Sequence, residues 1–132
     1  MKLKAGDAQT ILNAIFAARE LKLPVKTAYW LARSAKQIGP EAEAFEMTRL
    51  GLLERYGKKD KKKQLITGEN GEVEFKDRDA FNVAFKELSD QEFEIKMDAL
   101  TLDKFEDPEG TMLVETGVMV GLLPLIEEPE YE

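Results

Sequence analysis

The nearest approach to a catalytic pattern in this sequence is Glu94-Ile95-Lys96, in which one residue separates an acid from a lysine. A carboxylate can hold Mg²⁺ and a nearby lysine can position water, so the pattern would suit a metal-dependent nuclease with a further acid. Three upstream aspartates could supply that acid: Asp77, Asp79 and Asp90. The alternation of Phe93, Ile95 and Met97 with charged residues is, however, typical of a strand with one face in solvent. We therefore prefer a solvated strand and expect no catalytic residue here.

Two other segments resemble binding motifs only in part. Asp77-Arg78-Asp79 is acidic, but it lacks the EF-hand spacing of oxygen ligands, and the start of a helix explains acids at this place. Gly68-Glu69-Asn70-Gly71 lacks the Lys-Ser/Thr pair that follows the glycines of a phosphate-binding loop. The sequence contains no histidine and no cysteine, which excludes Ser-His, Cys-His and histidine–metal chemistry. We expect a protein without enzymatic activity, metal or cofactor.

The run Lys58-Lys59-Asp60-Lys61-Lys62-Lys63 is the one cluster that could follow a phosphate backbone. Proteins that bind single strands combine such a run with a stacking aromatic ring, a role open to Tyr56. The net charge of −7 opposes general affinity for nucleic acid, and Asp60 weakens the local field. We prefer a solvated, mobile loop that is dispensable for folding, and nucleic acid is disfavoured as a partner.

Apolar and aromatic residues provide the candidates for an interaction surface. Tyr29 and Trp30 are adjacent on a predicted helix, so they cannot both face one core stripe, and an exposed aromatic is typical of interfaces. The segment 112–126 is too apolar for one helical face, which favours an exposed patch and self-association. It is also shorter than the roughly 20 residues that span a bilayer, so we expect no membrane contact. The candidate surface comprises Tyr29, Trp30, Met119, Leu122, Leu123 and Ile126.

The length of 132 residues predicts one domain. We divide it into a helical region (1–57), a basic loop (58–63) and a mixed α/β region (64–132). Asp7 is placed to cap a first helix, and Leu23-Pro24 ends that helix and begins a second, so the two should pair as an antiparallel hairpin. The apolar stripe of the first helix comprises Ala8, Ile11, Leu12, Ile15 and Phe16.

Glycine and proline mark the boundaries in the middle of the chain. Gly39-Pro40 must either kink the second helix or make it restart, and the helical pattern ends near Gly57. Asn70-Gly71 predicts a β-hairpin. Asp77 or Asp79 is placed to cap the next helix, which has a clear apolar stripe. That stripe comprises Ala80, Phe81, Ala84, Phe85 and Leu88.

The last part of the chain mixes two periodicities. Residues 93–97 alternate as one strand, and residues 100–102 continue an alternation that could form a second. Residues 118–126 predict a short, apolar last helix. The fold class is therefore α+β: mainly helical, with an N-terminal antiparallel helical hairpin and a small antiparallel β element.

Five segments, spread over most of the chain, share their pattern with known proteins. They are Leu21-Lys22-Leu23-Pro24-Val25-Lys26-Thr27-Ala28-Tyr29, the helix ending at Tyr56-Gly57, the helix around Phe81, the strand Phe93-Glu94-Ile95 and the end Leu122-Leu123-Pro124-Leu125-Ile126. Together they resemble a family of small uncharacterised proteins encoded by tailed phages and prophages of Gram-positive bacteria. The resemblance implies a phage setting. It implies no catalytic residues and no particular activity.

The leading hypothesis is a non-enzymatic phage-encoded accessory or assembly protein that acts by protein–protein contact with a phage or host protein. The alternative is a phage effector that binds and inhibits a host enzyme or defence component, for which an acidic surface would mimic nucleic acid. A carboxylate–metal nuclease comes third. No signal-peptide pattern follows Met1, so we expect a place in the cytoplasm of the infected or lysogenic bacterial host. The assembly hypothesis also allows association with the virion.

Overall fold

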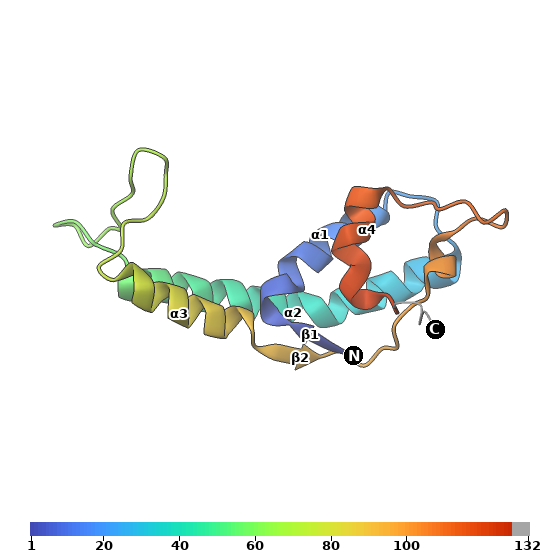
Figure 1. Cartoon of the computed structure of the whole chain (residues 1–132), viewed down its shortest axis with the longest axis horizontal. Coiled ribbons are helices and arrows are strands. Elements are labelled where there is room, and N and C mark those ends of the chain that lie inside the picture. The colour runs from blue at the N-terminus through green and yellow to red at the C-terminus, as the bar shows by residue number, and fades with distance from the viewer. Residues whose placement is uncertain (128–132) are drawn as a thin grey trace.

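The structure, a computed structural model, describes residues 1–127 and is shown in Figure 1. Its elements, with η denoting a 3-10 helix, are β1 (Lys2–Lys4), η1 (Ala5–Asp7), α1 (Ala8–Ala18), α2 (Val25–Tyr56), α3 (Arg78–Ser89), β2 (Glu92–Glu94), η2 (Leu102–Phe105), α4 (Thr116–Leu122) and η3 (Leu123–Leu125). α1 and α2 pack together as the N-terminal hairpin. The fold is mainly helical α+β with a small antiparallel sheet, as the sequence predicts.

α2 is one continuous helix of 32 residues, about 48 Å long, and it runs through most of the molecule (Figure 1). Gly39-Pro40 lies inside it, so of the two outcomes that the sequence left open, a restart is wrong. Proline removes one helical hydrogen bond. The side chains of Ile38 and Ala42, on either side, are buried in the core and hold both halves of the helix in place.

The molecule is elongated, with a thick head at one end and a narrow arm at the other (Figure 1). We call residues 1–42 and 91–127 the head, and residues 43–90 the arm. The head contains the hydrophobic core, to which α1, the first part of α2, α4 and η3 contribute. Its largest fully buried apolar side chains are Ile11, Ile15, Leu31, Ile38, Ile95, Phe105, Leu122 and Leu125.

The sheet of the head consists of two short strands. β1 pairs antiparallel with β2, with Leu3 opposite Phe93. The sequence predicts a strand at residues 93–97, of which only the first part forms β2, and it does not predict β1. The expected strand at 100–102 is wrong: Leu100 makes only an isolated parallel bridge with Ile126, and η2 begins at Leu102.

The first helix occurs where the sequence predicts it, with two corrections. Asp7 makes no side-chain hydrogen bond to the start of α1 because it belongs to the preceding η1, so it is not a cap. Phe16 is 46% exposed rather than part of the core stripe. Ala14 and Ala18 are buried instead, which turns the buried face of α1 away from Phe16.

The arm is a second helical hairpin, in which α3 returns beside the second part of α2 (Figure 1). Asp77 caps α3 as predicted, since its carboxylate accepts a hydrogen bond of 3.0 Å from the N–H of Ala80. Residues 57–76 connect the helices through isolated antiparallel bridges, among them Lys59 with Leu65 and Thr67 with Val73. The predicted hairpin is therefore present as single bridges rather than as regular strands. In residues 1–127, no helix is both long and apolar enough to span a membrane.

Candidate interaction surface

The arm differs from the head because it buries no apolar side chain. Over residues 43–90, all of which the structure describes, every apolar side chain remains at least partly exposed. α3 has the apolar stripe that the sequence predicts. α2 packs along it, and η1 contacts α3 near its C-terminal end, where Gly6 lies against Ser89. A helical stripe that one helix covers along most of its length stays open on its other flank.

Five aromatic rings form a continuous cluster in the arm. The ring centroids of Phe75 and Phe81 are 4.4 Å apart and stacked, and those of Phe81 and Phe85 are 5.8 Å apart. Edge contacts at 6.0 Å and 6.5 Å add Phe45 and Tyr56 to the cluster. Each aromatic pair contributes about 0.5–1.5 kcal/mol beyond its buried area, so this cluster holds the arm together although no ring is fully buried.

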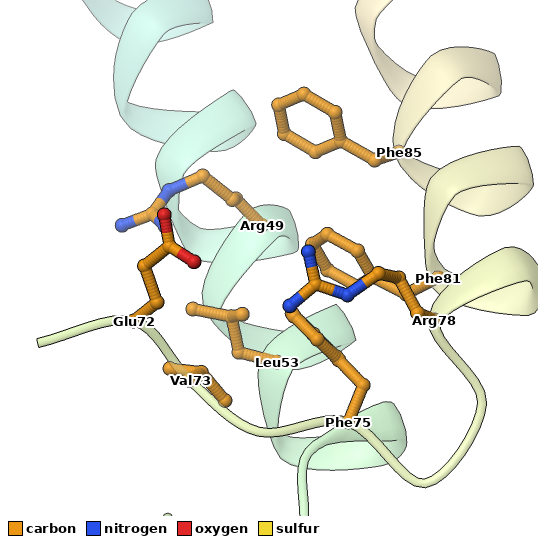
Figure 2. Close-up of a pocket in the computed structure, with 8 residues that line it drawn as sticks. All are labelled: Arg49, Leu53, Glu72, Val73, Phe75, Arg78, Phe81 and Phe85. Atoms are coloured by element: carbon orange, nitrogen blue, oxygen red, sulfur yellow. The ribbon is translucent and has the colours of Figure 1, made fainter. Parts of the chain in front are cut away.

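One side of this cluster opens into a groove, which we call the arm groove (Figure 2). Its volume is about 350 Å³, and its lining residues are Arg49, Leu53, Glu72, Val73, Phe75, Arg78, Phe81 and Phe85. α2 supplies two of these residues, α3 supplies three, and the connecting hairpin supplies the remainder. An apolar floor with a few charged groups at its edge is the usual composition of a protein–protein contact.

Two arginines at the edge of the arm groove have defined partners. The Nε of Arg49 donates a hydrogen bond of 2.8 Å to Oε2 of Glu46. This hydrogen bond, together with the guanidinium charge, lowers the pKa of the Glu46 carboxyl. The guanidinium of Arg78 lies 5.2 Å from the centre of the Phe75 ring, as in a cation–π contact. Both guanidinium groups therefore lie beside the aromatic floor with a defined neighbour.

Gly57 sets the hairpin directly against the end of α2. A Cβ atom at this position would lie 2.5 Å from the carbonyl oxygen of Leu53 and 2.6 Å from a methyl carbon of Leu65. Only glycine permits this approach. The hairpin residues Val73 and Phe75 then reach the flank of the helices, where they complete the arm groove.

The predicted interaction residues Tyr29 and Trp30 lie on the head. Tyr29 is 65% exposed, with the guanidinium of Arg33 5.8 Å from its ring centre. Trp30 is half-buried, and its Nε1 donates a hydrogen bond of 3.1 Å to the backbone oxygen of Asp98. The two rings do not share one core stripe, as the sequence predicts. Tyr29 remains available for contact, whereas Trp30 is largely committed to the head.

The predicted C-terminal patch is wrong in its central residues. Leu122 is fully buried and Ile126 is only 7% exposed, so neither side chain can contact a partner. Met119 is partly buried against the core, and Leu123 is 48% exposed. The physical reason is the close packing of α4 on α1, through which the apolar run becomes core.

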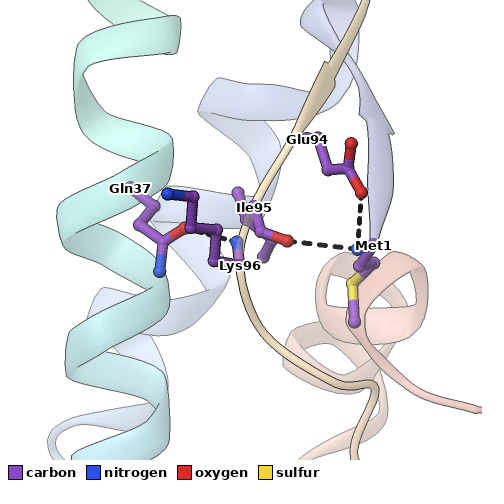
Figure 3. Close-up of polar contacts among 5 residues, drawn as sticks. All are labelled: Met1, Gln37, Glu94, Ile95 and Lys96. Carbon is purple, nitrogen blue, oxygen red and sulfur yellow. Dashed lines mark hydrogen bonds and ion pairs between the residues drawn. The ribbon is translucent and has the colours of Figure 1, made fainter.

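Figure 3 shows Glu94 and Lys96 in the head: Glu94 is the last residue of β2, and Lys96 lies in the segment that follows it. Oε1 of Glu94 lies 3.9 Å from the amine of Met1, and that amine donates a hydrogen bond of 3.1 Å to the oxygen of Ile95. The backbone N–H of Lys96 donates to Oε1 of Gln37 at 2.6 Å. The side chains of Glu94 and Lys96 are exposed while Ile95 is 1% exposed, so the predicted alternation is confirmed.

The aspartates proposed for a nuclease do not converge on Glu94. Asp77 and Asp79 lie at the start of α3 and Glu94 follows its end, so the 12 residues of the helix separate them by about 18 Å. Asp90 pairs with Lys4 at 3.7 Å. Among residues 1–127, no group of three acids is placed to hold a metal ion.

The lysine run forms the outermost loop of the arm, and all of its side chains are exposed. The carboxylate of Asp60 accepts hydrogen bonds from the backbone N–H groups of Lys62 and Gln64, at 2.8 and 3.0 Å. The ring of Tyr56 is half-buried and makes an edge contact with Phe81, so part of it is engaged within the arm rather than extended toward the lysines.

The sequence misses the arm groove as a site. The sequence does contain a feature that marks this region, because four of the seven phenylalanines fall between positions 45 and 85. Periodicity assigns these residues to a core, however, and does not reveal that the core has one open side. Comparisons with protein-family models, curated proteins and solved structures give no match to this chain. Its function must therefore be argued from the arm groove and the surface charges.

Proposed function

We propose that this protein is a non-enzymatic accessory or assembly protein, and that it acts by protein–protein contact through the arm groove. One observation supports this: the arm places five aromatic residues in contact and buries none of them. Exposed apolar patches of this kind mark interaction sites in soluble proteins. Aromatic and arginine side chains at the centre of a patch are also those that dominate binding energy.

The setting that we propose is a phage or prophage of a Gram-positive bacterium, with the partner encoded by the phage or by its host. The resemblance of the segments around Leu23-Pro24-Val25 and Leu122-Leu123-Pro124 supports it. In this proposal the protein acts in the cytoplasm of the infected or lysogenic cell, and a virion component is among the partners allowed.

The test is photo-crosslinking from two valines in cells that make the protein. A photoreactive phenylalanine analogue at Val73 lies in the arm groove, and the matched control at Val25 is 84% exposed on the head. We expect discrete covalent adducts from position 73, and no discrete adduct from position 25. Equal adduct patterns from both positions, or none from position 73, would reject the arm groove as the contact surface.

A second candidate function is the inhibitory effector, which the acidic surface of the head favours. Between residues 92 and 115 the head carries eight acids and two lysines. The acids are Glu92, Glu94, Asp98, Asp103, Glu106, Asp107, Glu109 and Glu115. All except two of them have exposed side chains. An effector that mimics nucleic acid would bind through these residues, so its affinity would fall steeply with salt and survive substitutions in the arm groove.

A further inference from the structure

We propose that the arm groove binds the arm of a second copy of this chain, with the two arms antiparallel and related by a two-fold axis. This inference rests on the proposed function, because it names the partner for the same groove. Two features of the arm favour a second copy of the chain as the occupant of the groove. The first is the incomplete covering of α2, and the second is the opposite charge of the two ends of the arm.

α2 has one inward stripe along its length, and only the first part of it is fully covered. In the head the stripe is buried at Thr27, Leu31, Ser34, Ile38 and Ala42. It continues at helical spacing through Phe45, Arg49, Leu53 and Tyr56, which are only half-buried. In the head, α1 packs on α2 and α4 packs on α1, whereas in the arm α3 is the one helix against α2. The arm therefore lacks an outer helical layer, which another helical hairpin would provide.

The two ends of the arm carry opposite charge. We call residues 55–63 the arm tip. We call residues 41–46 with 87–92 the arm base, which spans the junction of the arm with the head. The arm tip has six basic residues and one acid: Arg55, Lys58, Lys59, Lys61, Lys62, Lys63 and Asp60. The arm base has six acids and no basic residue within its own segments: Glu41, Glu43, Glu46, Glu87, Asp90 and Glu92. Two of these acids have basic partners from outside the base, since Asp90 pairs with Lys4 and Glu46 with Arg49. Two acids adjoin the tip: the carboxylate of Glu54 lies 2.8 Å from Nζ of Lys59, and the backbone oxygen of Glu74 accepts a hydrogen bond of 2.8 Å from the N–H of Lys58. The basic residues of the tip still outnumber these acids.

The helical rise brings these opposite charges to the same level in an antiparallel pair. Arg49 lies midway along the arm, eight residues from Gly57 and eight from Glu41, or about 12 Å in each direction. A two-fold axis at the level of Arg49 would therefore place each arm tip beside the partner copy's arm base. A parallel pair would instead bring two basic tips together, and like charges in contact oppose binding. Charge thus selects the antiparallel orientation, and the aromatic floor supplies the apolar contact.

The first experiment exchanges charge between the two ends. The tip variant carries Lys61→Glu and Lys62→Glu, and the base variant carries Glu43→Lys and Glu92→Lys. These four side chains are exposed, so folding should be unaffected. Sedimentation of the native chain at micromolar concentration and low salt should show a dimer. Each variant alone should dissociate at least about tenfold more readily, because the substitutions remove most of the charge of its tip or of its base and so weaken the attraction between them.

A mixture of the two variants is the decisive sample, because one of the two contacts in a mixed dimer then joins an unaltered tip to an unaltered base. We expect the mixture to dimerise more tightly than either variant alone. A native chain that remains monomeric at tens of micromolar would overturn the proposal. So would a dimer that neither variant weakens, or a mixture that dimerises no more tightly than either variant alone.

Crosslinking then tests the orientation in a chain that has no cysteine of its own. Positions 62 and 92 of one copy lie beyond opposite ends of α3. They are therefore farther apart than the roughly 7 Å limit for the Cα atoms of a disulfide. Lys62→Cys with Glu92→Cys in one chain should oxidise to a covalent dimer, and Lys62→Cys alone should not. A covalent dimer from the single variant would show a parallel pair and refute the antiparallel one. A monomeric native chain whose Val73 position still captures another protein would refute self-association while leaving the proposed function intact.

Discussion

The contact between α4 and α1 depends on Gly121, and replacing it by alanine tests how the C-terminal run becomes core. A Cβ atom at Gly121 would lie 2.6 Å from the Cβ of Ala14, about 1 Å short of the ordinary carbon–carbon separation of about 3.5–4.0 Å. Ala14 has no rotamer with which to yield, so α4 must move away from α1. Overpacking of this kind costs about 1–3 kcal/mol.

Gly117 provides the matched control in the same helix, because nothing lies within 4 Å of the Cβ that it would gain. Neither glycine has a positive φ angle, so alanine fits both backbones. Gly117→Ala should stabilise the protein by about 0.5–1 kcal/mol, the usual gain of alanine over glycine in a helix. Gly121→Ala should be less stable than Gly117→Ala by the full packing cost, about 1–3 kcal/mol.

Urea denaturation followed by the fluorescence of Trp30 measures both free energies of unfolding. At this chain length, each kcal/mol shifts the melting temperature by about 3–5 °C. A second substitution, Ala14→Gly, removes the atom that clashes, so in this background Gly121→Ala should change from destabilising to neutral or stabilising. Equal effects of Gly121→Ala in the two backgrounds would show that the contact with Ala14 is not what limits the approach of α4.

Three further predictions concern the arm. Because the arm buries no apolar side chain, far-ultraviolet circular dichroism at low protein concentration should detect its unfolding at lower urea than Trp30 fluorescence detects unfolding of the head, and coincident transitions would contradict this. Replacing the five lysines of residues 58–63 by serine should change the free energy of unfolding by under about 1 kcal/mol, and a loss of several kcal/mol would show that the loop is a packed element. The pKa of the Glu46 carboxyl, lowered from 4.5 by its hydrogen bond and charge contact with Arg49, should rise toward 4.5 in Arg49→Gln when followed by nuclear magnetic resonance. The stabilisation from this pair is therefore present above about pH 4.5 and lost as the pH falls through the lowered pKa.

The elements that the sequence predicts well are those whose signal is local. The helix from Arg78 to Ser89 has both a cap at Asp77 and a regular stripe, and the structure contains both. Alternation predicts a strand at residues 93–97, and the structure has one there, but it covers only Glu92–Glu94. Asp7 fails as a cap because capping depends on the turn that precedes the helix, and η1 takes that place. Gly39-Pro40 fails as a break because packing of the buried residues on either side outweighs one lost hydrogen bond.

The interaction surface could not be predicted for a different reason. Periodicity identifies which side chains of a helix are apolar, but it contains no information about how many neighbours cover them. Leu122 and Phe85 have the same signal in the sequence, yet Leu122 is fully buried between packed helices and Phe85 remains half-exposed in the arm groove. Tertiary contacts decide whether an apolar side chain is covered. Small residues let α4 pack closely on α1 and cover Leu122, whereas no second helical layer lies over the described arm. A surface of this kind becomes visible only when the buried and exposed apolar residues are compared along one helix, as α2 allows from Leu31 to Tyr56.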